Sequence, residues 1–194
     1  MRSFFYFLLM LLSFSGVHSQ DYFLKNNGPY NKNIQTPEEF LGYEIGFQHT
    51  RHDLILSYLN YLSDNSEKAE LIQYGKTHEG RNLVILTVSS EDNLKNLGQI
   101  QKEHLKYTIP GASVSSSEDL PIIINLGYGV HGNEPSSSEA ALLTAYTLVA
   151  SKNKKIEKFR TNAVVFIDPA INPDGRDRHT QWANQHKSIH LVSD

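Results

Sequence analysis

One short segment of the sequence holds two side chains that could bind a metal ion together. His131 and Glu134 lie three residues apart in the run Gly127-Tyr128-Gly129-Val130-His131-Gly132-Asn133-Glu134-Pro135. An imidazole nitrogen and a carboxylate oxygen at this spacing can converge on one tetrahedral Zn²⁺, each at about 2.0–2.2 Å. We therefore predict that His131 and Glu134 are zinc ligands. A third protein ligand must then come from elsewhere in the chain, and a fourth position is left for water.

The same pair also has an interpretation without a metal. His131 would then be a histidine of a surface loop, and Glu134 would complement the positive N-terminus of the helix that follows. A His-x-x-Glu pair alone is a weak signal, since ordinary amino-acid usage produces it by chance on the order of once in several proteins.

A second segment of interest runs from Asp168 to Arg178. It contains Asn172-Pro173-Asp174-Gly175, a combination of residues that predicts a turn. Arg176 and Arg178 follow, and guanidinium groups can bind a substrate carboxylate bidentately. The alternative is that both are solvated charges on a loop.

The composition limits the chemistry that these segments can perform. The sequence has no cysteine, which excludes disulfides, thiolate zinc sites, iron–sulfur clusters and a thiol nucleophile. Any metal must therefore be bound by histidines and carboxylates. The formal net charge is −3, so the chain lacks the basic excess that nucleic-acid binding requires, and we expect no nucleic acid as a partner. A length of 194 residues with 39% hydrophobic residues fits one globular domain.

The first nineteen residues have the pattern of a secretory signal peptide. Arg2 gives a positive start, residues 4–14 are almost continuously apolar, and small residues precede Gln20. The apolar run is shorter than the roughly 20 residues needed to cross a bilayer. We expect a signal peptide at 1–19, a secreted or periplasmic protein, and no membrane span after the signal is removed. Residues 20–35 are predicted to form a loop or a loosely held N-terminal arm.

The elements that must position the two segments follow from hydrophobic spacing and turn residues. Thr36 is a predicted N-cap before Pro37, and a second helix is predicted over about 50–63, with an inner face of Leu54, Tyr58, Leu59 and Leu62. Two strands, 69–74 and 83–88, are predicted to form a β-hairpin. A further helix is expected over 91–105, followed by a surface loop over 110–118.

A βαβ unit is predicted next. Residues 121–126 and 163–167 read as strands buried on both faces, and 136–150 as a buried helix between them. We therefore expect an α/β fold with a mixed, mainly parallel central sheet and helices on both faces. Ligands in such folds bind beyond the carboxyl ends of the strands, which is where His131 and Asn172 lie.

Three motifs in this order resemble one known family. Residues 74–81 (Tyr-Gly-Lys-Thr-His-Glu-Gly-Arg), His131-Gly132-Asn133-Glu134, and residues 171–175 (Ile-Asn-Pro-Asp-Gly) resemble those of zinc metallocarboxypeptidases of the carboxypeptidase A and B type, and most closely the secreted bacterial members. The resemblance covers about 36–182. It implies a zinc-dependent hydrolase that removes C-terminal residues from peptides and proteins, with His131 and Glu134 as zinc ligands. Asn133 occupies the place where pancreatic members have a substrate-contacting arginine.

The resemblance also implies an incomplete catalytic set. Members have a catalytic domain of roughly 300 residues, in which the third zinc ligand and the general-base Glu lie well after the Asn-Pro-Asp-Gly segment. We therefore expect residues 36–194 to be the amino-terminal part of such a domain, with the general base beyond residue 194 and apolar surface left open. His179, His186 and His190 are the candidates within this chain for a substitute ligand, the last two being four residues apart.

Two other functions remain open at this point. Relatives with the same His-x-x-Glu scaffold deacylate amino acids or cut cell-wall peptides, because a fold does not fix a function. The chain could instead be an inactive, truncated module that binds a peptide without cleaving it.

Overall fold

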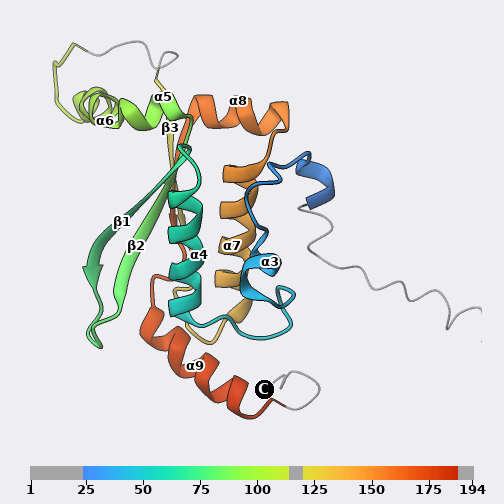
Figure 1. The fold of residues 1–194 in the computed structure, drawn as a ribbon. Coiled ribbons are helices and arrows are strands. Elements are labelled where there is room, and N and C mark those ends of the chain that lie inside the picture. Colours follow the sequence, from blue (N-terminus) through green and yellow to red (C-terminus); the bar gives the residue numbers. More distant parts are fainter. Residues whose placement is uncertain (1–23, 114–119, 188–194) are drawn as a thin grey trace, which may run out of the picture.

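A computed structural model describes residues 24–113 and 120–187 and contains a mixed four-stranded sheet with helices packed on it (Figure 1). The strands lie in the order β1-β2-β4-β3. Their bounds are Ala69–Lys76 for β1, Asn82–Val88 for β2, Ile122–Gly127 for β3 and Ala163–Asp168 for β4. The α/β class expected from the sequence is confirmed.

The direction of the strands differs in part from the prediction. β3 and β4 are parallel, as the βαβ unit requires, but β1–β2 and β2–β4 are antiparallel pairs. Since a short hairpin loop can join only antiparallel neighbours, β1 and β2 cannot contribute a parallel pair. The four described strands therefore form a mixed sheet in which antiparallel pairs outnumber the parallel one, and not a mainly parallel sheet.

Helices α4 (His52–Asp64) and α7 (Pro135–Ala150) lie side by side on one face of the sheet and bury the core (Figure 1). The inner face of α4 contains Ile55 in place of the predicted Leu54, which is only half-buried. The remaining inward residues Tyr58, Leu59 and Leu62 are confirmed as fully buried. Ile55 has the i, i+3, i+4, i+7 spacing with Tyr58, Leu59 and Leu62 that places all four on one side of the helix. This spacing explains why Ile55, and not Leu54, is buried.

The other helices lie mainly at the two ends of the sheet (Figure 1). Helices α5 (Glu91–Lys95), α6 (Leu97–Lys106) and α8 (Lys154–Asn162) gather at one end, and α9 (Pro173–Gln185) lies at the end where β3 and β4 finish. The single helix expected over 91–105 is thus divided at Asn96, whose φ of −106° and ψ of 13° depart from helical values. No helix in the described ranges is long and apolar enough to span a bilayer.

Strand β3 is more exposed than predicted. It forms the edge of the described sheet, and Ile122 and Ile123 are 65% and 40% exposed, so the expected burial on both faces is wrong for this strand. β4, which has a neighbour on each side, is buried as expected. On the face opposite α4 and α7, Ile72 and Tyr74 of β1 are also exposed. The described part of the chain therefore leaves apolar surface open, as anticipated.

The described part of the N-terminal arm is held firmly against α7. The Asn31 amide donates to the Ala150 carbonyl at 2.8 Å, and the Lys152 amide donates to the Pro29 carbonyl at 2.7 Å. The Tyr30 ring stacks on the Tyr146 ring at a centroid distance of 4.9 Å. The prediction of a loosely held arm is therefore wrong over residues 24–35. The expected signal peptide lies outside the described residues.

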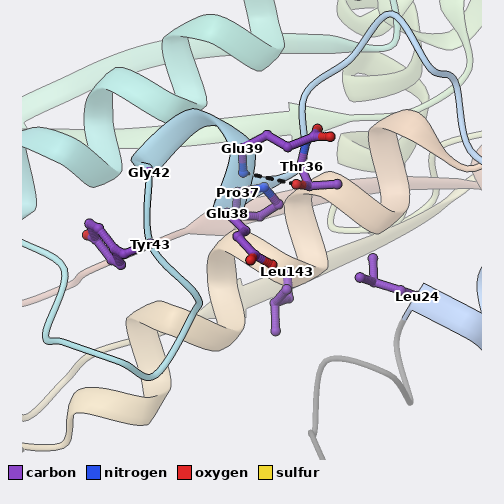
Figure 2. A pocket seen from close by; sticks show the side chains of 8 residues that line it. All are labelled: Leu24, Thr36, Pro37, Glu38, Glu39, Gly42, Tyr43 and Leu143. Atoms are coloured by element: carbon purple, nitrogen blue, oxygen red, sulfur yellow. Dashed lines mark hydrogen bonds between the residues drawn. The ribbon is translucent and has the colours of Figure 1, made fainter. Parts of the chain in front are cut away.

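A hollow of about 580 Å³ lies between this arm, α3 (Pro37–Leu41) and α7 (Figure 2). Thr36 caps α3 as predicted, because its hydroxyl accepts from the Glu39 amide and the Glu39 carboxylate accepts from the Thr36 amide. Two of the polar residues at this hollow, Thr36 and Glu39, thus form the cap. None of the residues predicted to do chemistry lines it.

Candidate metal centre

The parallel pairing of β3 with β4 brings the two predicted segments to the same edge of the sheet. The Ile171 amide donates to the Tyr128 carbonyl at 2.8 Å, and the Asn172 amide donates to the Gly129 carbonyl at 3.0 Å. The loop after β4 is therefore hydrogen-bonded to the loop after β3. The expectation that both lie together at the carboxyl ends of their strands is confirmed.

His131 and Glu134 point toward each other on this edge. The distance from His131 Nδ1 to Glu134 Oε1 is 3.2 Å, and the two side chains are 68% and 61% exposed. Two ligands on one tetrahedral zinc ion lie roughly 3.4 Å apart, from metal–ligand distances of about 2.1 Å. The observed distance fits a shared ion, and it equally fits a direct hydrogen bond between the imidazole and the carboxylate. Both side chains are therefore accessible, and each has an atom that can bind a metal ion.

The described residues do not complete a metal cage around this pair. In residues 24–113 and 120–187, no three or more His, Asp or Glu side chains are grouped closely enough to hold an ion. His186 is the C-cap that follows α9, and its Nδ1 lies 2.7 Å from the Trp182 carbonyl oxygen, within hydrogen-bond distance. His190 lies outside the described residues. The pair therefore fits two positions of a zinc site and leaves the others to be filled.

Two glycines allow the backbone conformation of the turn that carries His131. Gly129 has a φ of +64°, a left-handed conformation that side chains disfavour. A Cβ atom on Gly132 would lie 1.9 Å from the Gly175 carbonyl carbon and 2.2 Å from the Arg176 nitrogen. Only a glycine at position 132 lets the turn approach the backbone of α9 this closely. The start of α9 therefore fixes the position of the segment that carries His131.

The Asn-Pro-Asp-Gly segment begins α9 and does not form the predicted turn. Asn172 is the N-cap, and its side-chain oxygen accepts from the Gly175 amide at 2.9 Å. Pro173 is the first helical residue and Asp174 lies in the first turn. Asn, then Pro, then an acidic residue is a pattern typical of helix starts, and this signal was available in the sequence.

The two arginines of this segment have different environments. The Arg176 side chain is only 2% exposed and donates to the Pro135 carbonyl at 2.8 Å and to Glu139 Oε1 at 2.6 Å. Arg176 is therefore bonded inside the protein and is not available to a substrate. The expectation that Arg176 could bind a substrate carboxylate is wrong. The Arg178 side chain is 81% exposed and remains accessible. Sequence spacing gave no signal for Glu139, because it lies 37 positions from its partner.

The hairpin loop between β1 and β2 is also attached to α9. Arg81 Nε lies 2.7 Å from Asp177 Oδ2, and Arg81 Nη1 lies 2.7 Å from Asp174 Oδ1. Asp174 also accepts from the Thr77 hydroxyl at 2.7 Å. Residues of the first motif and of the third motif thus bind each other directly. All three motifs converge on the first turns of α9.

A hollow of about 520 Å³ opens beside His131. Its walls are the His131 turn and one side of α9, formed by His131, Gly132, Asn133, Asn172, Gly175, Arg178, His179 and Trp182. The candidate metal ligand is therefore reached from a cavity large enough for part of a peptide.

A family model described as zinc carboxypeptidase matches residues 55–190, which span most of the chain. The chain belongs to the zinc carboxypeptidase family. The matched range contains all three converging motifs, so the family resemblance of the sequence is confirmed. No curated protein matches the sequence.

One solved structure shows a fold similar to that of this chain. Thrombin activatable fibrinolysis inhibitor matches with a TM-score of 0.53 and 15% identity, over 81% of this chain and 34% of that one. Carboxypeptidase A from Helicoverpa armigera matches with a TM-score of 0.49 and 18% identity, over 83% of this chain and 34% of that one. At these identities only the fold is shown, and by the first match alone. The chain spans about a third of the length of both structures.

Proposed function

We propose that this chain contributes the zinc-binding turn of a metallocarboxypeptidase, which hydrolyses C-terminal residues from peptides and proteins. The observation that carries the proposal is the 3.2 Å distance between His131 Nδ1 and Glu134 Oε1 at the carboxyl end of β3. Membership of the zinc carboxypeptidase family supports it. The exposed position of both side chains beside a hollow also supports it, because a substrate must reach the metal.

The residues present would do part of the work of such an enzyme. His131 and Glu134 would hold Zn²⁺, and Gly132 and Arg176 would keep their turn in place. Zn²⁺ supplies polarisation of the scissile carbonyl and a lowered pKa for a water molecule. The third ligand and the general-base glutamate are proposed to lie beyond residue 194. Residues 36–194 would then be the amino-terminal part of the catalytic domain, exported by a signal peptide at 1–19.

Zinc titration of this chain by calorimetry tests the ligand pair. We expect His131→Ala and Glu134→Gln each to weaken zinc binding by at least the roughly 10–100-fold that loss of an outer-shell partner costs. His78→Ala, which removes an exposed histidine of the hairpin loop, is the matched control and should leave zinc affinity unchanged. Equal zinc affinity in the original chain and in all three variants would refute the proposed ligands.

Catalysis by this chain alone is a separate question. Because a general base and a third ligand are missing from the proposed set, we expect weak zinc binding and no measurable hydrolysis by a protein comprising residues 20–194. Chelator-sensitive cleavage of a blocked dipeptide by that protein would show that the catalytic set is complete within it.

A further inference from the structure

Residues 152–158, at the start of helix α8, form a strongly basic segment in an acidic chain. The segment contains four lysines and one glutamate, while the formal net charge of the whole chain is −3. All four lysines are exposed. None of the four forms an ion pair with another residue in the ranges 24–113 and 120–187. Their positive charge is therefore not neutralised by direct pairing within the described part of the chain.

The lysines lie at positions that weaken α8. Lys154 and Lys155 are its first two residues, and the helix dipole disfavours cations near a helix N-terminus. Lys154 and Lys158 are four positions apart, a spacing at which like charges repel each other. Helix α5, in contrast, has Glu91 and Asp92 in its first turn. The stability of α8 therefore does not explain these lysines, and binding to a partner does.

Helix α8 packs inward through one row of side chains and directs the lysines outward. Ile156 packs against the core, and Arg160, four positions later, is only 3% exposed. Lys154 and Lys158 form a different row of the helix, and Lys155 begins a third. The cations thus lie on the side of α8 that faces away from the protein.

Phe159 adds an apolar group to this outward side. Phe159 is 37% exposed and follows Lys155 by four positions, so the two lie one above the other on the helix. Lysines beside an exposed aromatic ring are typical of helices that lie in the headgroup region of a bilayer. We define the α8 surface as Lys152, Lys154, Lys155, Lys158 and Phe159.

The chemistry of the α8 surface favours a diffuse anionic partner. Its cations are all lysines, and an ammonium group is a point charge that lacks the planar fork with which arginine binds one anion at two points. Each lysine close to a bilayer with anionic lipid strengthens binding about fivefold. A charged lipid surface attracts several such groups at once without requiring a fixed geometry.

The α8 surface and the candidate metal centre lie at opposite ends of the sheet (Figure 1). Helix α8 leads directly into β4 at Ala163, whereas the His131 turn and α9 follow the ends of β3 and β4. Strand β4 has 6 residues, so the two ends are roughly 20 Å apart. A bilayer in contact with α8 would therefore leave the hollow beside His131 open to solvent.

We propose that the α8 surface binds peripherally to a membrane that contains anionic phospholipid. The lysines contact the headgroups, and the Phe159 ring enters the border of the acyl chains. This role does not depend on the proposed zinc-dependent activity. It explains why cations gather on one exposed side of a helix whose own stability they lower.

Cosedimentation with lipid vesicles tests the proposal. The protein used comprises residues 20–194, because the apolar run at 4–14 would bind lipid by itself and every described residue is retained. We expect binding to vesicles of phosphatidylcholine and phosphatidylglycerol to be about tenfold tighter, or more, than to vesicles of phosphatidylcholine alone. High salt should remove the difference, because it screens exposed charges. Equal binding to both vesicles at low salt would overturn the proposal.

Variants assign the binding to α8. Lys154→Gln combined with Lys158→Gln should weaken binding to the anionic vesicles about 25-fold, from about fivefold for each lysine. Lys154→Arg combined with Lys158→Arg keeps both charges and should retain the binding. The matched control, Arg51→Gln combined with Lys76→Gln, removes the same charge at the end of the sheet near α9 and should also retain it. Unchanged binding in the first variant, or an equal loss in the control, would contradict the assignment.

Trp182 of α9 reports the orientation, because it is the only tryptophan in the sequence. Vesicles with brominated acyl chains quench a tryptophan that touches the bilayer. We expect no quenching of Trp182 in the bound protein and clear quenching of Phe159→Trp in a Trp182→Phe background. Quenching of Trp182, or no quenching at position 159, would show that another surface contacts the lipid and would overturn the proposal.

An acidic polypeptide is the other partner that exposed lysines could bind. Soluble polyglutamate tests it in competition with the anionic vesicles. Because polyglutamate offers no apolar phase to Phe159, we expect Phe159→Ala to weaken binding to vesicles but not to polyglutamate. Tighter binding of polyglutamate than of vesicles at equal anionic charge would identify an acidic polypeptide as the partner and would overturn the membrane assignment.

Discussion

Arg176 and Glu139 form a buried ion pair with an Nη2–Oε1 distance of 2.6 Å, and their side chains are 2% and 8% exposed. Their other polar atoms are also bonded. Arg176 Nε donates to the Thr50 carbonyl at 3.0 Å, and Glu139 accepts from the Thr50 amide and hydroxyl, both at 2.7 Å. With the Arg176 bond to the Pro135 carbonyl, the pair joins the starts of α4, α7 and α9 next to Glu134.

The first prediction concerns this pair. Arg176→Met should lower the free energy of unfolding by about 3–5 kcal/mol, because it leaves the Glu139 carboxylate buried without its cation. Urea denaturation measures the change. The matched control is Arg178→Met, which removes an exposed arginine two positions away and should change stability by about 0.5 kcal/mol or less.

A double variant separates the ion pair from general disruption of the core. Arg176→Met combined with Glu139→Leu should be more stable than the sum of the two single effects, since no unpaired charge is left. Additive losses in urea denaturation would mean that the two charges do not stabilise each other.

Gly132 is the subject of the second prediction. Gly132→Ala should destabilise the fold by roughly 1–3 kcal/mol or more, because the added methyl group meets the backbone of Gly175 and Arg176. The same displacement should move His131 and weaken zinc binding. Gly98→Ala is the control: a Cβ atom there meets nothing within 4 Å, and it lies in α6. It should stabilise the protein by about 0.5–1 kcal/mol, and thermal denaturation of both variants checks the contrast.

The sequence predicted those elements whose pattern is local. The β1–β2 hairpin and helix α7 were found because alternation, glycines and continuous apolar runs depend only on neighbouring residues. The burial of β3 was wrong because it depends on what lies beside the strand. Its residues read as apolar in either case, and only the sheet order shows that β3 is at an edge.

The sequence likewise predicted only part of the candidate site. His131 and Glu134 are three residues apart, so their proximity follows from local geometry and is observed at 3.2 Å. The fate of Arg176 could not be predicted, because its partner Glu139 lies on another helix. A charged side chain in a loop-like segment is normally exposed, and only tertiary packing reverses that expectation.

The third prediction concerns acid sensitivity. The His49 and His179 rings lie 5.1 Å apart. Burial, the neighbouring His179 and Arg176 lower the pKa of His49. Burial and Arg176 lower the pKa of His179. Below a pH of about 6.5 the unfolded chain therefore binds more protons than the folded chain, and stability falls as the pH decreases. His179→Gln should flatten the fall in stability measured by urea denaturation between pH 7 and pH 5. His78→Gln, on the exposed hairpin loop, should leave it unchanged.

The last prediction concerns Tyr74 and Asp168, at the open face of the sheet. The Tyr74 hydroxyl donates to Asp168 Oδ2 at 2.6 Å, and burial with this hydrogen bond raises the pKa of Tyr74 to about 12, so the group stays a donor. Burial raises the pKa of Asp168, and the hydroxyl opposes that rise. Tyr74→Phe should therefore cost about 1.5 kcal/mol at neutral pH, the lower end for a bond to a charged group because Tyr74 is half-exposed.

The pH dependence identifies the cause of that cost. A raised pKa means that folding favours the protonated carboxyl group, so Asp168 destabilises the fold most at pH values above its folded pKa. Removing the hydroxyl raises this pKa further, and the difference in stability between the original chain and Tyr74→Phe should shrink as the pH falls toward 4. In an Asp168→Asn background the same substitution should cost the same at every pH, because no carboxylate remains to titrate. A pH-independent cost of Tyr74→Phe in the original chain would show that packing of the ring, and not its bond to the carboxylate, accounts for the loss.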